Sequence, residues 1–172
     1  MFVGSLHPRK NLARLFTAFD IFKKRSNNDI RLLIVGEKKW WTEPIKNAYD
    51  AMTHKDDVIF TGRLSADELH HVTASALASV YVSYFEGFGI PIVEAFRCDT
   101  PVITSNVTSM PEVAADAALL IDPFDVNSIA DAMEKVLNDD IRKELIEKGR
   151  IRCQDFSWDK AAEEWWKCIM KV

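Results

Sequence analysis

Short apolar runs alternate with longer helical stretches along the whole chain, and this alternation restricts the possible folds more than any other feature. Strands separated by helices form βαβ units, whose parallel sheet has helices on both faces. The sequence therefore predicts an α/β fold with a doubly wound parallel sheet of about six strands. We expect these strands at Phe2 to Gly4, Arg31 to Val35, Val58 to Thr61, Ser79 to Ser83, Pro101 to Thr104 and Ala118 to Ile121.

The segments between the strands carry helical patterns and capping signals. Ser65 and Glu68 have the spacing of a capping box, while Asp125 and Ser157 are candidate N-caps. No repeat or linker interrupts the pattern, so residues 1–172 are expected to form one domain. Helices are predicted at Leu12 to Phe22, Trp41 to Met52, from Ser65 onward, after Pro91, and at Val126 to Leu137, Ile141 to Cys153 and Lys160 to Met170.

The composition excludes several classes of partner. The net charge is -4, whereas proteins that bind nucleic acids or anionic membranes usually carry a basic surface. The three cysteines and four histidines lack metal-ligand spacing, so we expect no metal site and a reducing, cytoplasmic location. No apolar run approaches the roughly 20 residues of a transmembrane helix, and residues 1–4 do not resemble a signal peptide.

A basic loop, Gly4 to Asn11, joins the first predicted strand to its helix. In an open parallel sheet, ligands bind beyond the carboxyl ends of the strands, beside helix N-termini. Gly4 lets the backbone turn, Arg9 and Lys10 bring two positive charges, and Asn11 is placed to cap the helix. A diphosphate is the matching anion. The alternative is an exposed basic turn without a ligand.

A second loop, Tyr84 to Ala95, places two glycines and a proline before a helix. The glycines let the backbone approach a ligand, and Pro91 suits a first helical turn, where we place Glu94. The two oxygens of Glu94 are able to bind vicinal hydroxyls, as on a ribose. In the alternative interpretation, Glu94 only complements the helix dipole and Glu86 is exposed on the surface.

These segments together resemble a known family. Seven residues separate Glu86 from Glu94, which resembles the Glu-x7-Glu motif of retaining glycosyltransferases of the GT-B fold, in particular glycosyltransferase family 4. The resemblance continues in the same order through nearly the whole chain. It includes the loop from Gly4, Phe60-Thr61-Gly62-Arg63, the run from Glu86 to Asn106, Met110-Pro111-Glu112-Val113, Leu120-Ile121-Asp122-Pro123 and Phe156-Ser157-Trp158.

The resemblance implies a role for each matching position. Arg9 and Lys10 match the loop that neutralises the donor diphosphate, and with Glu86, near the donor sugar, they are the candidate catalytic residues. Glu94 matches the residue that binds the ribose. Glu94→Ala should then weaken nucleotide binding, whereas Glu86→Ala should barely change it. The candidate donor-binding residues are Gly4, Ser5, Arg9, Lys10, Gly62, Arg63, Leu64, Glu86, Gly87, Phe88, Gly89, Ile90 and Glu94.

Two positions depart from the family pattern. Ser5 stands where many relatives have an arginine, so one phosphate ligand is missing or replaced by Arg9. Asp99 stands where relatives tend to have glycine, and aspartate tolerates the left-handed conformation that such a turn needs.

The family's activity implies what this chain does. Such enzymes transfer a sugar from a nucleotide diphosphate sugar to an acceptor hydroxyl, with retention and without a required metal or other cofactor. The loop from Gly4 resembles those of mannosyl-type transferases of bacterial surface polysaccharide synthesis, which favours a GDP-sugar over a UDP-sugar.

The family also implies a missing part. Its enzymes have two Rossmann-like domains, and this chain matches only the donor-binding one. We therefore expect residues 1–172 to bind the donor and to transfer nothing without an N-terminal acceptor-binding domain, through which any contact with the inner face of the membrane would be made. One face of the last helix should pack on this domain, leaving Trp165 or Trp166 partly exposed or covered by a second copy.

The residues leave two alternative functions open. A sugar-nucleotide epimerase on the same fold would also bind a nucleotide diphosphate, and product assays with and without acceptor would distinguish it. A flavodoxin-like interaction module would bind no sugar nucleotide, which calorimetry with nucleoside diphosphates would test.

Overall fold

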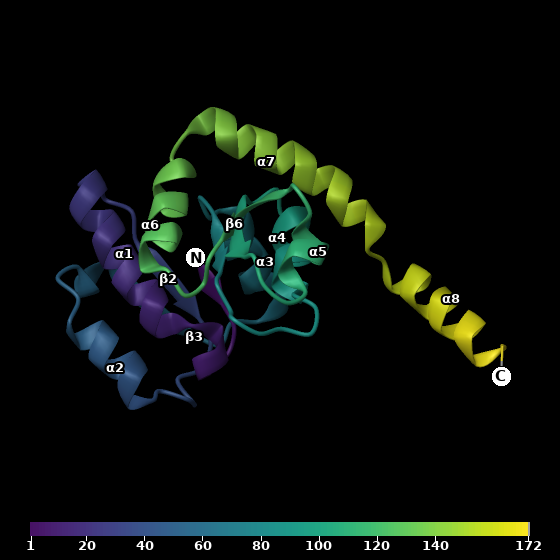
Figure 1. The fold of residues 1–172 in the computed structure, drawn as a ribbon, viewed down its shortest axis with the longest axis horizontal. Coiled ribbons are helices and arrows are strands. Elements are labelled where there is room, and N and C mark those ends of the chain that lie inside the picture. The colour runs from purple at the N-terminus through teal and green to yellow at the C-terminus, as the bar shows by residue number, and fades with distance from the viewer. Residues whose placement is uncertain (172) are drawn as a thin grey trace.

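The structure, a computed structural model, describes residues 1–171 (Figure 1). Strands and helices alternate in these residues, as the sequence predicts. The strands are β1 (Phe2–Val3), β2 (Leu32–Val35), β3 (Val58–Gly62), β4 (Ser79–Tyr81), β5 (Val102–Ser105) and β6 (Ala118–Ile121). The α-helices are α1 (Leu12–Ser26), α2 (Glu43–Asp50), α3 (Ala66–Ala74), α4 (Ile90–Arg97), α5 (Met110–Ala114), α6 (Val126–Lys135), α7 (Asp139–Arg152) and α8 (Trp158–Ile169).

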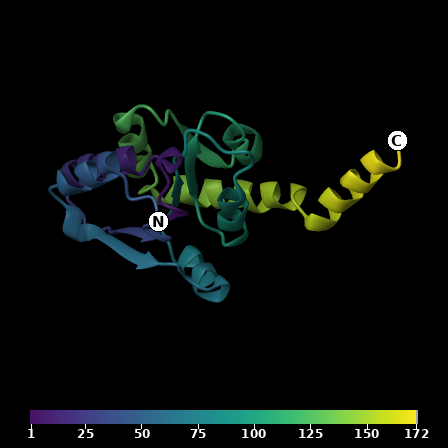
Figure 2. The same cartoon turned by 90° about the horizontal axis from the view of Figure 1, so that it is seen from below.

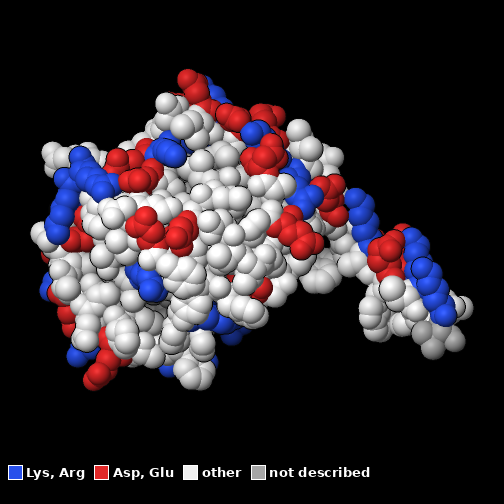
Figure 3. Space-filling model, viewed as in Figure 1, with Lys and Arg blue, Asp and Glu red and all other residues white. Residues whose placement is uncertain are grey.

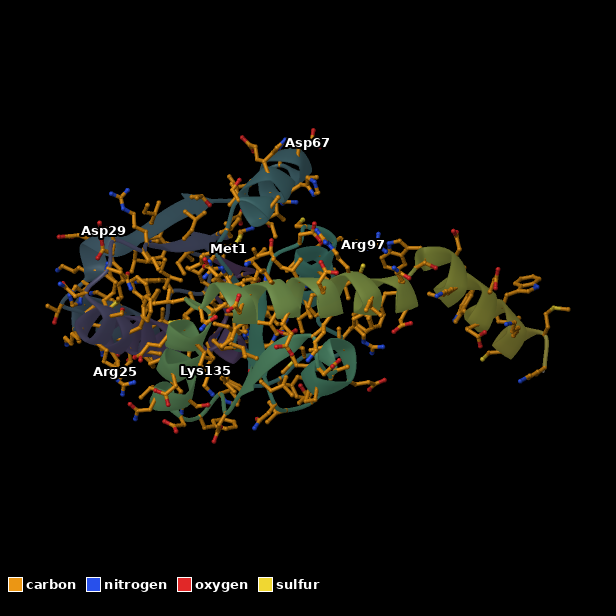
Figure 4. The ribbon with its side chains drawn as sticks, turned by 90° about the horizontal axis from the view of Figure 1, so that it is seen from above. Met1, Arg25, Asp29, Asp67, Arg97 and Lys135 are labelled. Carbon is orange, nitrogen blue, oxygen red and sulfur yellow. The ribbon has the colours of Figure 1, made fainter. Side chains whose placement is uncertain are left out.

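The strands form two parallel ladders, β1-β2-β3 and β4-β5-β6, that meet at Met1. The backbone N–H of Val80 donates to the Met1 carbonyl at 2.8 Å, and the Met1 nitrogen donates to the Ala78 carbonyl at 2.7 Å. Met1 accordingly lies near the middle of the body (Figure 4). The spatial order is therefore β3-β2-β1-β4-β5-β6, and the direction of winding reverses between β1 and β4. The predicted doubly wound sheet is confirmed.

Alternate residues of the central strands face opposite sides of the sheet, as a period of two requires. Val80, Val82 and Ile103 belong to the apolar core under α1, α2 and α6. Tyr81 and Val102 belong to a second core under α4 and α5. Helices thus cover both faces of the sheet. The side chain of Tyr81, with its hydroxyl, lies on the face that α4 covers.

Most helix boundaries agree with the capping signals. Ser65 forms the predicted capping box with Glu68, and the side chains of Asp125 and Ser157 cap α6 and α8. The boundaries of α2 and α7 were predicted less well. The helix α2 is shorter than predicted, and α7 begins at Asp139, two residues before the predicted start, with Asn138 as its N-cap. The short helix α5 was not predicted, since its five residues are too few to show a periodic pattern.

The last helix, α8, projects from the body and packs on nothing in residues 1–171 (Figures 1 and 2). None of its residues is buried, so the expectation that one face packs on this domain is wrong. Trp165 is 70% exposed and Trp166 is 60% exposed, as predicted for at least one of them. Charged side chains follow one side of this helix (Figure 3). No helix among residues 1–171 has the length and the apolar composition needed to cross a bilayer.

Candidate functional site

The two loops singled out in the sequence meet where the winding of the sheet reverses. The first follows β1 and the second follows β4, and the N–H of Tyr84 donates to the Arg9 carbonyl at 3.1 Å. The crevice beyond such a reversal is where open α/β sheets bind ligands. The fold therefore brings the predicted basic loop and the predicted acidic loop together at this point.

Glu86 is the centre of a buried ion cluster. Only 9% of the residue is exposed, which excludes the interpretation that it is a surface residue. Its Oε1 lies 2.7 Å from the Nζ of Lys10, and its Oε2 forms an ion pair with Arg9. Arg9 also donates to the Phe85 carbonyl at 3.2 Å. Lys10 and Arg9 are thus held together beside the carboxylate, with Lys10 buried and Arg9 partly open to solvent.

The cluster shifts the pKa values of its members. Burial alone would raise the pKa of the Glu86 carboxyl, but the contacts with Lys10 and Arg9 help to outweigh it and lower that pKa. Burial lowers the pKa of the Lys10 ammonium, and the bond to Glu86 offsets this in part. Because Glu86 stays ionised, it keeps two cations in place at the carboxyl end of the sheet.

Asn11 has a different role from the predicted one. It precedes α1 as its N-cap residue in the left-handed conformation, with φ of 64°, but its side chain makes no capping hydrogen bond. Instead the Asn11 Nδ2 donates to the carbonyls of Val82, at 3.1 Å, and Pro123, at 2.7 Å. The side chain is 2% exposed and therefore connects the loops after β1, β4 and β6 inside the protein.

Glu94 is exposed and lies on the open side of α4. The helix begins at Ile90, after Gly89 with φ of 116°, so Glu94 is its fifth residue and the first turn contains no acidic side chain. Its predicted position in the first turn is therefore wrong by one residue. Its carboxylate makes no ion pair within residues 1–171.

A pair of hydroxyl side chains after β5 holds the glycine-containing loop in place. The single O–H of Ser109 is shared between the carbonyls of Phe88, 2.7 Å from Oγ, and Glu86, 3.0 Å from Oγ. The backbone N–H of Glu86 donates to the Thr108 Oγ1 at 3.3 Å. These two residues were not predicted from the sequence, although the run of Ser and Thr residues between β5 and α5 is a turn signal.

Glycines stand at the carboxyl ends of three strands: Gly4 after β1, Gly36 after β2, and Gly62 as the last residue of β3. Gly36 was not predicted, yet a Cβ at this position would lie 2.0 Å from the Gly4 carbonyl oxygen. The Gly36 N–H donates to the Gly62 carbonyl at 2.9 Å. Gly36 therefore sets the distance between the basic loop and the segment from Gly62, where Arg63 is exposed and Leu64 is half-buried.

Other candidate sites are weaker. No group of three or more His, Cys, Asp or Glu side chains within residues 1–171 is arranged to hold a metal ion. An apolar cavity of about 500 Å³ lies at the opposite edge of the sheet, among residues such as Met1, Phe22 and Val136. Its lining includes none of Arg9, Lys10 and Glu86, so this cavity is separate from the ion cluster.

Comparisons with known proteins identify the family. Residues 1–152 match the family model described as glycosyl transferases group 1. The chain is 32% identical over 165 residues to O-antigen chain mannosyltransferase B of Escherichia coli, covering 95% of this chain and 43% of that protein. An O-antigen chain mannosyltransferase of Salmonella typhimurium is 33% identical over 134 residues, which cover 78% of this chain and 37% of that protein.

Among solved structures, sucrose-phosphate synthase from Thermosynechococcus elongatus matches with a TM-score of 0.84 and 27% identity. The match covers 99% of this chain and 44% of that one, so the fold is one Rossmann-like half of a GT-B enzyme. This chain therefore spans less than half the length of these relatives. The match to the family model over most of the chain shows that it belongs to the group 1 glycosyl transferases.

Proposed function

We propose that this chain is the donor-binding domain of a retaining glycosyltransferase that uses a nucleotide diphosphate sugar without a required metal. The observation that carries the proposal is the pairing of Lys10 and Arg9 with the buried Glu86 at the winding reversal. Charge develops on the leaving diphosphate during transfer, and fixed cations in a site that excludes water stabilise such charge. Lys10 and Arg9 are these cations, and the N-terminus of α4 adds its positive dipole end.

The proposed reaction is hexosyl transfer to an acceptor hydroxyl in the synthesis of a bacterial surface polysaccharide. The names of the O-antigen mannosyltransferases above support this assignment and favour a GDP-sugar. Transfer also requires the acceptor to be held against the donor. We propose that a second domain holds the acceptor, and the greater length of the relatives supports this. The isolated chain should then bind the donor without transferring sugar.

A thermal-shift screen tests the donor site. We expect GDP to raise the melting temperature more than UDP or ADP, and magnesium to leave the GDP effect unchanged. A ligand at about 100 times its dissociation constant stabilises a protein by roughly 2.7 kcal/mol, which a melting curve resolves. If none of the three nucleotides changes the melting temperature at millimolar concentration, the donor-site proposal is wrong.

Glu94→Ala should weaken GDP binding by about ten- to a hundredfold, because hydrogen bonds to a charged group contribute roughly 1.5 to 3 kcal/mol. The side chain is exposed, so the melting temperature of the free protein should change little. Glu163→Ala, on the projecting helix α8, is the matched control and should bind GDP as the original protein does. Isothermal calorimetry measures the difference, and equal affinities for the two variants would contradict the ribose assignment.

A further inference from the structure

Tyr81 brings a polar atom to the ion cluster from the interior of the protein. The residue is 2% exposed and belongs to the core under α4. Its hydroxyl accepts a hydrogen bond from the Nζ of Lys10 at 2.8 Å, and the same nitrogen lies 4.6 Å from the centre of the phenol ring. Burial and the charge of Glu86 raise the pKa of Tyr81, so the hydroxyl remains neutral beside the ammonium.

The donors of Lys10 are divided between this hydroxyl and Glu86. An ammonium group has three N–H donors. Tyr81 accepts one of them and Glu86 Oε1 lies 2.7 Å from the same nitrogen, so the third remains for another acceptor. On the adjacent side, a Cβ added at Gly4 would lie 3.7 Å from Nζ. The absence of a side chain at Gly4 therefore leaves space next to the ammonium.

Fixing this nitrogen in advance has a physical consequence. A free lysine side chain has many rotamers, and immobilising it on binding costs conformational entropy. Two partners on fixed elements, Tyr81 on β4 and Glu86 in the loop after it, remove most of that freedom before a ligand arrives. Tyr81 differs from Glu86 in being neutral, so it orients Lys10 without competing with an anion for its charge.

We propose that Tyr81 is a positioning residue for Lys10, which it holds with one N–H directed to the diphosphate of the donor. The proposal rests on the proposed donor site. It adds a residue that does not touch the ligand and acts on it only by orienting Lys10. The position follows from the alternation along β4, since Val80 and Val82 face the other core.

The test is the binding of GDP and guanosine to Tyr81→Phe, which keeps the ring and removes only the hydroxyl. We expect GDP affinity to fall about five- to tenfold and guanosine affinity to stay unchanged, because guanosine has no phosphate for Lys10. Tyr49→Phe removes a phenol hydroxyl on α2, whose ring packs on Phe16 in the other core. It is the control and should leave both affinities unchanged. Equal losses for GDP and guanosine in Tyr81→Phe would overturn the proposal.

A double-mutant cycle with Lys10→Met separates this proposal from the donor site itself. If Tyr81 acts through Lys10, Tyr81→Phe should have no further effect on GDP affinity once Lys10 is replaced. Independent, additive losses would overturn the positioning role and leave the donor site intact. If Lys10→Met does not weaken GDP binding, the assignment of Lys10 to the diphosphate fails, and the positioning role fails with it.

Discussion

Gly36→Ala should destabilise this chain by about 3 to 5 kcal/mol, a large part of the stability of a typical domain. A Cβ at this position would lie 2.0 Å from the Gly4 carbonyl oxygen, so the backbone of one strand end must move. The φ of 148° adds strain for any residue other than glycine. Overpacking and backbone strain each cost roughly 1 to 3 kcal/mol.

The matched control is Gly87→Ala, because a Cβ there would meet no atom within 4 Å. Thermal unfolding of both variants should show a melting temperature lowered by about 10 °C or more for Gly36→Ala and nearly unchanged for Gly87→Ala. Gly36→Ala should also lose GDP affinity below its melting temperature, since Gly4 belongs to the basic loop. Similar melting temperatures for the two variants would show that the strand ends are not tightly packed.

The sequence predicted the elements that depend on local signals. The alternation of strands and helices, the capping box at Ser65 and the caps at Asp125 and Ser157 are encoded within a few residues of each other. By contrast, α5 has only five residues, and α8 shows a strong apolar stripe although none of its residues is buried. A stripe indicates that a face is able to pack, and it does not indicate on what it packs.

The sequence predicted those parts of the candidate site whose charged residues lie in short motifs along the chain. The contacts that fix those residues could not be predicted, because they join distant segments. Tyr81 is separated from Lys10 by 71 residues and Asn11 from Pro123 by 112 residues. Only the fold determines that these pairs meet, so no local pattern distinguishes Tyr81 from an ordinary core residue.

Asp99 has one property that the sequence predicted and one contact that only the fold shows. The sequence predicted that aspartate would tolerate the left-handed turn after α4, and its φ of 54° confirms this. The structure adds that both Asp99 carboxylate oxygens accept hydrogen bonds from Arg150 at 2.8 Å. Arg150 lies on α7, so the side chain that replaces the family's usual glycine also connects α4 to α7.

Glu86→Gln should destabilise the free protein by about 3 to 5 kcal/mol, because it leaves the buried Lys10 without its negative partner. Arg9 is partly open to solvent and is able to turn outward, whereas Lys10 is enclosed. Glutamine has nearly the same shape as glutamate, so the loss reports the charge. Glu163→Gln, at an exposed position on α8, should leave stability unchanged and serves as the control.

The pH dependence of unfolding provides a second measurement. The pKa of Glu86 is lowered in the folded protein, so its contribution to stability is complete above the ordinary glutamate pKa of about 4.3 and is lost as the pH falls through the lower folded value. The difference in unfolding free energy between wild type and Glu86→Gln should therefore be largest near neutral pH and decrease in acid. A difference independent of pH would contradict an ionic cause.

The ligand dependence of the same variant tests whether the cluster is the diphosphate site. The ion pairs of Glu86 with Lys10 and Arg9 now lead us to expect an effect on free nucleotide, which the sequence-based assignment to the donor sugar did not. A diphosphate brings negative charge to the two cations, so it should recover part of the stability that Glu86→Gln loses. GDP should thus raise the melting temperature of Glu86→Gln by more than that of the wild type, and guanosine should not. If the GDP shift is the same or smaller in Glu86→Gln, the diphosphate does not bind at Lys10 and Arg9.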